Sequence, residues 1–170
     1  MKRWWCRRLE TGESPLPQLW RIITHFPCRT MQTMKPPASC PCGGTSYSTC
    51  CGPFIDGAAI PPDAETLMRS RYTAYTLRNE AYLRSTWHSS TCPPDPILTD
   101  DEGLHWLGLD VKSALRLRQR KVKTVDEPDQ DSVEFVARYK INGRAYRLHE
   151  LSRFVREGVR WFYLDGSFPE

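Results

Sequence analysis

The chain has no long hydrophobic run: nothing in its 170 residues approaches the roughly 18 uncharged apolar residues of a membrane-spanning helix. It also has no apolar segment of about 7–15 residues after its basic start, as a secretory signal requires. Arg7, Arg8, Glu10 and Glu13 interrupt any such segment. These absences predict a cytoplasmic protein that does not enter a membrane.

The common catalytic motifs are absent as well. The sequence has no nucleophile elbow, no glycine-rich phosphate loop and no set of histidines and carboxylates at metal-ligand spacing. Its composition of 39% hydrophobic and 26% charged residues is that of a globular chain and excludes extensive disorder. We expect one compact domain with an appendage, and we leave enzymatic activity open while favouring a non-catalytic role.

The net charge of +4 is concentrated at the N-terminus. Residues 1–33 contain six basic and two acidic side chains, which leaves 18 of each sign in the remaining 137 residues. The body of the chain is therefore neutral, and its overall charge indicates no partner.

Residues 1–33 mix basic, tryptophan and proline residues without a helical or strand period, so we expect little stable structure there. Met31 and Met34 lie just before the first regular pattern. The extension is then either a start-site artefact or a basic tail that touches RNA or a membrane surface. We draw no function from it.

Four of the seven cysteines fall within twelve residues, at Cys40, Cys42, Cys50 and Cys51. In a cytosolic chain such clustering favours a metal over disulfides. Gly43 and Gly44 allow the backbone to reverse, so that four thiolates can close a tetrahedron around Zn²⁺.

Four protein ligands leave no position for water, so the expected zinc is structural. A redox pair and ordinary buried thiols are the alternatives. The other cysteines, Cys6, Cys28 and Cys92, are interpreted as free thiols.

The run Cys-Pro-Cys-Gly followed by Cys-Cys-Gly-Pro resembles the SEC-C zinc motif at the C-terminus of the translocation motor SecA. Seven residues separate Cys42 from Cys50, where many SEC-C motifs have eight. In SecA-type proteins the motif contacts the secretion chaperone and the ribosome. The resemblance therefore implies a zinc knuckle over residues 38–56 and one of these two partners.

The rest of the chain predicts two helices followed by four antiparallel strands, which is an α+β domain over residues 62–168. Asp63 and Asn79 are N-cap residues for helices over 64–77 and from 80 to about 87. From Leu104 the period becomes two, with Trp161, Tyr163 and Asp165 on a common face. Hairpin turns are expected at 129–131, 142–143 and 157–158.

The segments 67–75, 82–83, 86–88, 133–139, 149–154 and 160–166 together resemble the YchJ family. In this family a SEC-C motif precedes a cone-shaped domain of the nuclear transport factor 2-like fold, with helices packed on a curved antiparallel sheet. The resemblance covers about residues 38–167. It implies an architecture and almost no activity.

Such a cone encloses a cavity, and cavities of this kind occur both in enzymes and in interaction modules. The candidate polar residues are Arg69, Arg71, His88, Glu134, His149, Glu150, Ser152, Arg153 and Asp165. A catalytic site would use His88 as general base, with Arg71 and Glu134 beside it. The alternative is a structural pairing of Arg71 with Glu134 or Glu150.

A basic run, Arg116 to Lys123, carries five cations in eight residues. It is interpreted either as a solvated edge strand or as an RNA-binding strand. RNA binding is the less favoured of these two interpretations.

Two functions follow. We favour an adaptor whose zinc knuckle, held by Cys40, Cys42, Cys50 and Cys51, contacts a protein or the ribosome. The alternative is a small-molecule binder or enzyme that uses the cavity. The sequence does not fix the oligomeric state.

Overall fold

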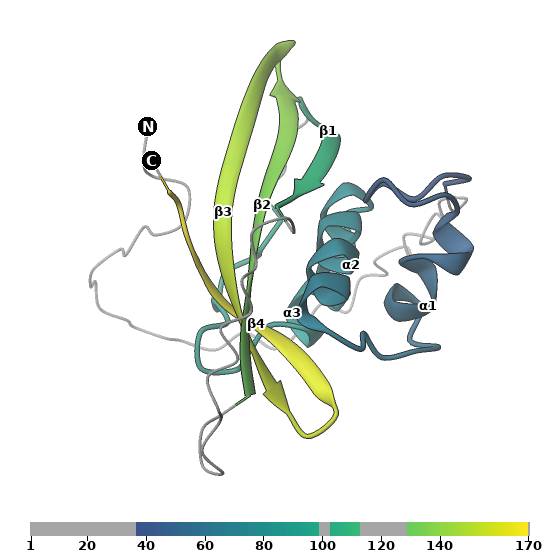
Figure 1. Ribbon diagram of the computed structural model, residues 1–170. Helices are drawn as coiled ribbons and strands as arrows, with labels where there is room; N and C mark the ends of the chain where they lie inside the picture. The colour runs from purple at the N-terminus through teal and green to yellow at the C-terminus, as the bar shows by residue number, and fades with distance from the viewer. Residues whose placement is uncertain (1–36, 99–102, 113–128, 170) are drawn as a thin grey trace, which may run out of the picture. The chain divides into compact units, whose positions relative to one another are not determined.

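The computed structural model describes residues 37–98, 103–112 and 129–169. The extension over 1–33 and the basic run over 116–123 lie outside these residues. The described chain runs from a short cysteine-rich knuckle through two helices into a four-stranded sheet (Figure 1). No helix within the described ranges is long and apolar enough to cross a membrane.

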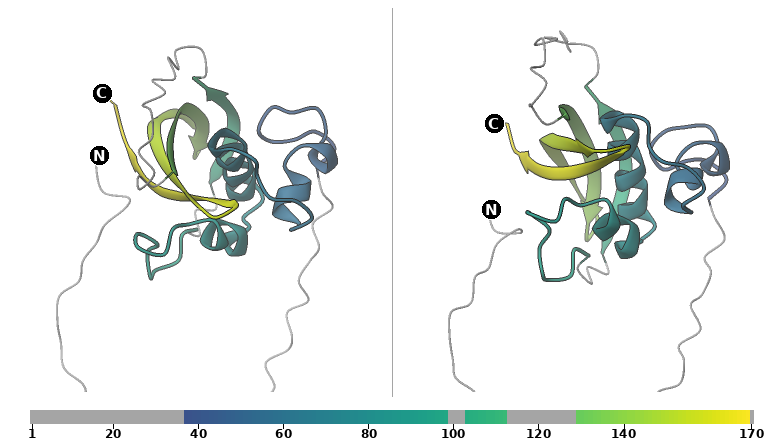
Figure 2. Two further views of the ribbon diagram at one scale, coloured as in Figure 1. Left: turned by 60° about the horizontal axis from the view of Figure 1, so that its bottom comes forward. Right: turned by 90° about the horizontal axis from the view of Figure 1, so that it is seen from below.

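The knuckle contains two very short helical segments, the 3-10 turn η1 (Tyr47–Thr49) and α1 (Gly52–Ile55). A proline in the first turn starts α1, since its missing N–H needs no partner there. Figure 2 shows α1 on the side of α2 that faces away from the sheet. The knuckle is thus a third layer packed against the helix.

Helices α2 (Ala64–Thr76) and α3 (Glu80–Ser85) begin at the two predicted caps. The Asp63 side chain accepts a hydrogen bond from Thr66 N at 2.7 Å, and Asn79 accepts one from Tyr82 N at 3.0 Å. Helix α3 ends two residues earlier than predicted. Beyond it the chain pairs with the sheet edge, where the His88 amide donates to the Tyr163 carbonyl.

The sheet has the order β1-β2-β3-β4 and every neighbouring pair is antiparallel. Its strands are β1 (Leu104–Val111), β2 (Asp129–Ile141), β3 (Arg144–Glu157) and β4 (Arg160–Ser167). The sheet is curved, and α2 packs on its inner face (Figures 1 and 2). This is the α+β architecture expected from the sequence.

The β2–β3 turn lies at Asn142-Gly143, where φ is +50° and +81° as a tight hairpin requires. The β3–β4 loop also includes Gly158, with φ +58°. The turn predicted at 129–131 is wrong. These residues begin β2 and pair with 154–156 of β3, because polar side chains on an exposed strand end mimic a turn signal.

A β-bulge at Leu164 changes which residues share a face. Tyr163 pairs with Phe154 while Asp165 pairs with Arg153, so one residue of β4 has no partner. Asp165 therefore lies on the outer face, and its predicted position beside Trp161 and Tyr163 is wrong. The extra residue shifts the alternation by one.

The core lies between α2 and the inner face of the sheet. Leu67 on the helix and Val133 and Phe154 on the strands are completely buried. Met68 and Tyr72 of α2 belong to the same cluster, which also contains Cys40, Cys42 and Cys51. The knuckle therefore shares one continuous core with the sheet domain.

Candidate metal centre

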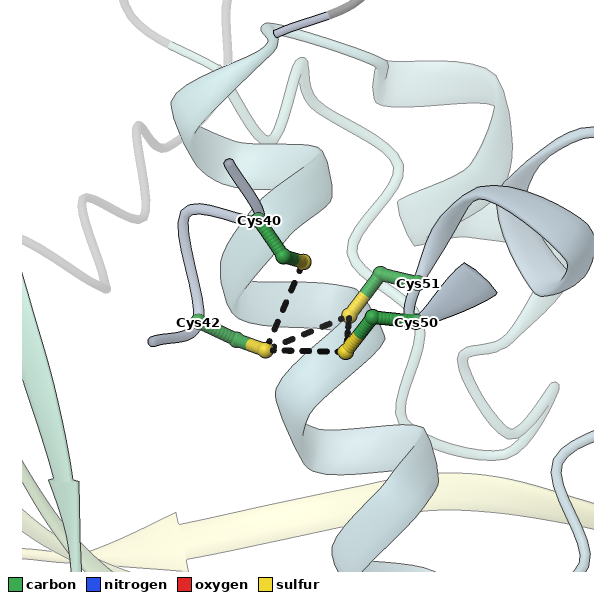
Figure 3. A group of neighbouring side chains, drawn as sticks. All are labelled: Cys40, Cys42, Cys50 and Cys51. Atoms are coloured by element: carbon green, nitrogen blue, oxygen red, sulfur yellow. Dashed lines mark hydrogen bonds between the residues drawn. The ribbon is translucent and has the colours of Figure 1, made fainter. Parts of the chain in front are cut away.

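The four clustered cysteines come from two short loops that face each other. A tight turn carries Cys40 and Cys42, closed by hydrogen bonds from Gly43 N to Cys40 O and from Cys40 N to Gly44 O. Cys50 follows η1, and Cys51 is the N-cap of α1. Figure 3 shows all four side chains pointing toward a common centre.

The sulfur atoms are spaced as a tetrahedral metal site requires. Cys42 Sγ lies 3.5 Å from both Cys40 Sγ and Cys50 Sγ and 3.6 Å from Cys51 Sγ. All four lie within 4.8 Å of one another. Zn–S bonds of about 2.3 Å in a tetrahedron place sulfur atoms about 3.8 Å apart, so little rearrangement is needed to hold the ion.

Gly44 allows the two loops to approach each other. A Cβ atom at this position would stand 2.6 Å from Cys50 Sγ, inside van der Waals contact. Any larger side chain would displace that thiol from the centre. The glycine pair predicted to reverse the backbone thus has two roles, since Gly43 supplies the positive φ of +94°.

Helix α2 supports the cysteines from behind. The Thr73 hydroxyl lies 3.8 Å from Cys40 Sγ, and Arg69 Nη1 donates to the Cys42 carbonyl at 3.3 Å. Hydrogen bonds of this kind orient metal ligands. Sequence patterns gave no sign of Thr73, because it lies 33 residues from Cys40 and meets it only after folding.

Burial and mutual hydrogen bonding perturb the thiols strongly. The hydrogen bond from Cys51 lowers the pKa of Cys42 to about 4, against the opposing effect of burial. The pKa of Cys50 rises to about 11, chiefly through burial. Donation to Cys42, followed by burial, raises the pKa of Cys51.

The donor set suits Zn²⁺. Four thiolates in a buried, nearly tetrahedral cluster are the ligands and geometry of closed structural zinc sites. Cys40, Cys42 and Cys51 are only 2–4% exposed, so water reaches the centre poorly. The site could hold a metal, and with all four positions filled by the protein a bound ion would be structural.

The three proposed cavity residues do not lie together. Arg71 is buried in the cone, where it donates to the Leu83 carbonyl and to the Thr86 hydroxyl, both at 2.7 Å. His88 follows α3, and its Nε2 lies 3.1 Å from the carboxylate of Glu157, the last residue of β3. Glu134 is on the opposite face of the sheet from Arg71 and bonds His149 at 2.7 Å.

Arg71 pairs directly with neither Glu134 nor Glu150 among the described side chains. Its guanidinium lies 5.1 Å above the Trp87 ring and 4.6 Å above the Tyr163 ring. The Tyr163 hydroxyl donates to Glu150 at 3.2 Å, and Ser152 donates to the same oxygen at 2.6 Å. Tyr163 therefore connects two buried charges that do not touch.

Burial dominates the electrostatics of this network. It raises the pKa of Glu150 despite the hydrogen bonds from Ser152 and Tyr163. It also lowers the pKa of Arg71 from its usual value. The charged residues could be recognised in the sequence, but the aromatic rings between them could not, since nothing in β4 distinguishes Tyr163 from a core residue.

The remaining candidate residues make surface pairs. Arg69 contacts Glu65 one turn earlier on α2 at 3.0 Å. Arg153 forms a two-pronged hydrogen bond with Asp165 across the outer face of the sheet. His149 and Glu150 project to opposite faces, as strand alternation requires.

A groove of about 400 Å³ lies between α1, α3 and β4. Its walls include Phe54, Ile60, Tyr82 and Trp161, and Arg160 is its one charged lining residue. None of the residues proposed from the sequence lines it.

Comparison with known proteins identifies the family. Residues 63–166 match the model of the YchJ middle domain of the nuclear transport factor 2-like fold. The chain belongs to the YchJ family. A UPF0225 protein of Cupriavidus metallidurans is 54% identical over 140 residues, which is 79% of this chain and 92% of that protein. A UPF0225 protein of Ralstonia nicotianae is 50% identical over 149 residues, covering 82% and 97%.

Two solved structures share the fold of this YchJ-family chain. One is the solution structure of a SEC-C motif protein from Rhodopseudomonas palustris, with a TM-score of 0.57 and 30% identity over 78% of this chain and 99% of that one. The other is the crystal structure of a SEC-C motif protein from Psychrobacter arcticus, with a TM-score of 0.54 and 28% identity. It covers 78% of this chain and 83% of the other.

Proposed function

We propose that the four cysteines bind one structural Zn²⁺, and that the resulting rigid knuckle is a docking surface for a protein or ribosomal partner. The observation that carries the proposal is the closed arrangement of Cys40, Cys42, Cys50 and Cys51, with all sulfur atoms within 4.8 Å. Such a site offers no open position for a substrate. Its contribution is therefore to hold a shape.

The shared core supports this role. Because three of the cysteines pack in the same cluster as Leu67 and Phe154, a bound metal would fix the knuckle relative to the sheet domain. The exposed surface of the knuckle consists of short polar and small residues over 43–49 and 56–60. Ile60, which is 45% exposed, is its one large apolar side chain. In this proposal the surface depends on the metal for its conformation.

The SEC-C resemblance suggests the ribosome and the secretion chaperone as partners to test. The purified chain would be sedimented with ribosomes and, separately, captured on immobilised chaperone, with bound zinc measured by elemental analysis. The test variant is Cys42→Ser/Cys51→Ser, and Cys92→Ser, outside the cluster, is the matched control. We expect zinc and partner binding to be lost only in the first variant.

A second double variant separates the surface from the fold. Thr45→Glu/Ser48→Glu changes two exposed side chains of the knuckle while leaving every thiol in place. Retained zinc with lost binding would locate the contact at the knuckle. Zinc bound by the wild type without binding to either partner would exclude both of them.

Small-molecule binding is the second candidate, favoured by the groove of about 400 Å³, which falls within the usual size of ligand sites. Arg71, His88 and Glu134, the residues proposed for the cone cavity, do not line this groove. A thermal-shift screen of small anionic and aromatic compounds tests it, with Arg160→Gln as the variant that should abolish any shift caused by an anion.

A further inference from the structure

The closed end of the β2–β3 hairpin is strongly basic. Residues 138–147 contain four cations, two tyrosines and no acidic residue. Figure 1 shows this end of the hairpin projecting beyond α2. We propose that it binds single-stranded nucleic acid, through phosphate contacts on one face and base stacking on the other. The proposal is independent of the zinc knuckle.

Three of the four cations, Arg138, Lys140 and Arg147, share the outer face of the hairpin, while Arg144 is on the face of Tyr139 and Tyr146. Arg138 lies directly opposite Arg147 in the strand register, and Lys140 lies opposite His105 of β1. The side chains of all four cations are exposed. Like charges placed directly across a ladder repel each other, so this arrangement weakens the sheet unless a polyanion neutralises it.

Acidic side chains do not offset this charge within the described part of the chain. The nearest acids on the outer face already have partners, since Asp110 contacts Lys112 at 3.1 Å and Glu134 contacts His149 at 2.7 Å. Neither Arg138 nor Arg147 forms an ion pair there. In the sequence, acidic residues at 100–102 precede β1 and lie outside the described ranges.

Protection of a sheet edge explains only some of these cations. β4 pairs with 151–157 of β3, so Arg144 and Arg147 lie on an open stretch where charge would discourage strand pairing. Arg138 and Lys140 are on β2, between β1 and β3. They have no edge to protect, and their positions require another reason.

The inner face of the same hairpin carries a row of aromatic rings. Trp106 lies 5.6 Å from Tyr139, which stacks on Tyr146 at 5.5 Å with an interplanar angle of 17°. The row begins at Tyr72 of α2, 5.5 Å from Trp106, and is anchored in the core. It ends at Tyr146, which is 37% exposed and has Arg144 at 5.6 Å from its ring.

Nucleic acid fits this combination better than an acidic protein or an anionic membrane. Cations on alternate residues, about 7 Å apart along a strand, suit a chain of phosphates. A rigid aromatic row ending in an exposed ring suits a base, because every base has a stacking face. A carboxylate-rich peptide or a lipid headgroup would use the cations and leave the tyrosines without a role.

The test measures binding of fluorescein-labelled oligouridine of about 15 nucleotides, the upper size of a single-strand site, by fluorescence anisotropy. It compares Arg138→Gln/Arg147→Gln with the matched double variant Arg156→Gln/Arg160→Gln at the β3–β4 hairpin. Both double variants remove two positive charges, so the two proteins have the same net charge. We expect at least about tenfold weaker binding from the first pair only. The slope of log affinity against log salt should also fall by about 1.4.

Tyr146→Leu tests the aromatic face. It should weaken binding about tenfold without changing the salt slope, because it removes stacking and no charge, while Tyr146→Phe should bind like the wild type. Oligothymidine should bind with similar affinity. The knuckle variant Thr45→Glu/Ser48→Glu should also retain affinity, which separates this surface from the proposed docking site.

Three results would overturn the proposal. The first is no binding by the wild type at about 50 mM salt, where phosphate contacts are strongest. The second is an equal loss in both arginine pairs, which would reflect net charge alone. The third is equally tight binding of polyglutamate or anionic vesicles, which would assign the surface to another class of partner.

Discussion

Gly44 lies against Cys50 so closely that a Cβ atom would stand 2.6 Å from the thiol sulfur. The position of that sulfur therefore depends on the absence of a side chain 6 residues earlier. Gly43 next to it has no atom within 4 Å of such a Cβ and is special only for its φ of +94°. The two neighbouring glycines thus serve different purposes, and substitution separates them.

Gly44→Ala should weaken zinc binding by about tenfold or more, because the added methyl group displaces one of four ligands. Gly43→Ala is the control. It should lower the free energy of unfolding by about 1 kcal/mol through backbone strain while leaving zinc affinity nearly unchanged. Competition with a chromophoric chelator measures both affinities. Equal zinc affinity in the two variants would contradict this assignment.

Thr73→Val should reduce zinc affinity by about tenfold, since the valine keeps the shape of the fully buried threonine and removes the hydroxyl near Cys40. Thr73→Ser keeps the hydroxyl and should retain most of the affinity. The same chelator competition provides the readout. If valine binds zinc as tightly as the wild type, the hydroxyl does not orient the ligand.

Metal removal should destabilise the whole described fold rather than the knuckle alone. Three cysteines share a core with Leu67 and Phe154, so losing the ion loosens a layer packed directly on α2. Chemical denaturation followed by tryptophan fluorescence, with and without chelator, measures the effect. We expect a single transition at lower denaturant without metal. A chelator-insensitive midpoint would show that the ion contributes nothing to the core.

Glu150 predicts a pH dependence with a defined sign. Burial raises its pKa in the folded protein, so at pH values between the ordinary and the raised pKa the folded state holds a proton that the unfolded state has lost. The free energy of unfolding therefore falls as pH rises through this window and levels off above the raised pKa.

Glu150→Gln cannot titrate and should remove this slope. Glu65→Gln, on the accessible side of α2, should keep it. Denaturant titrations between about pH 5 and 8 measure both variants, because in this range carboxylates with lowered pKa values, such as Asp165, stay ionised. An unchanged slope in Glu150→Gln would assign the dependence to another group.

Local rules predicted the parts of the fold that depend on neighbours in sequence. Asp63 and Asn79 cap their helices because a side-chain oxygen two or three residues before an amide is a local arrangement. The Asn142-Gly143 turn is local for the same reason. The spacing of the four cysteines was likewise enough to predict that their sulfur atoms form one cluster.

Long-range features could not be read from the sequence. The bulge at Leu164 arises from how β4 fits β3, and no residue type marks it. Because of this bulge, Asp165 lies on the outer face of the sheet, whereas strict alternation predicts the inner face. Likewise, α3 ends early because Thr86 and His88 pair with Tyr163, about 75 residues later, and that pairing competes with the helix only in the folded chain.

The most direct test of the metal centre is X-ray absorption at the zinc edge, combined with elemental analysis of the purified full-length chain. The four sulfur positions predict one zinc per chain, bound by four sulfur atoms at about 2.3 Å. Cys42→Ser should give fewer sulfur ligands or no metal. A wild-type chain without stoichiometric metal, or with nitrogen or oxygen ligands in place of sulfur, would contradict the account.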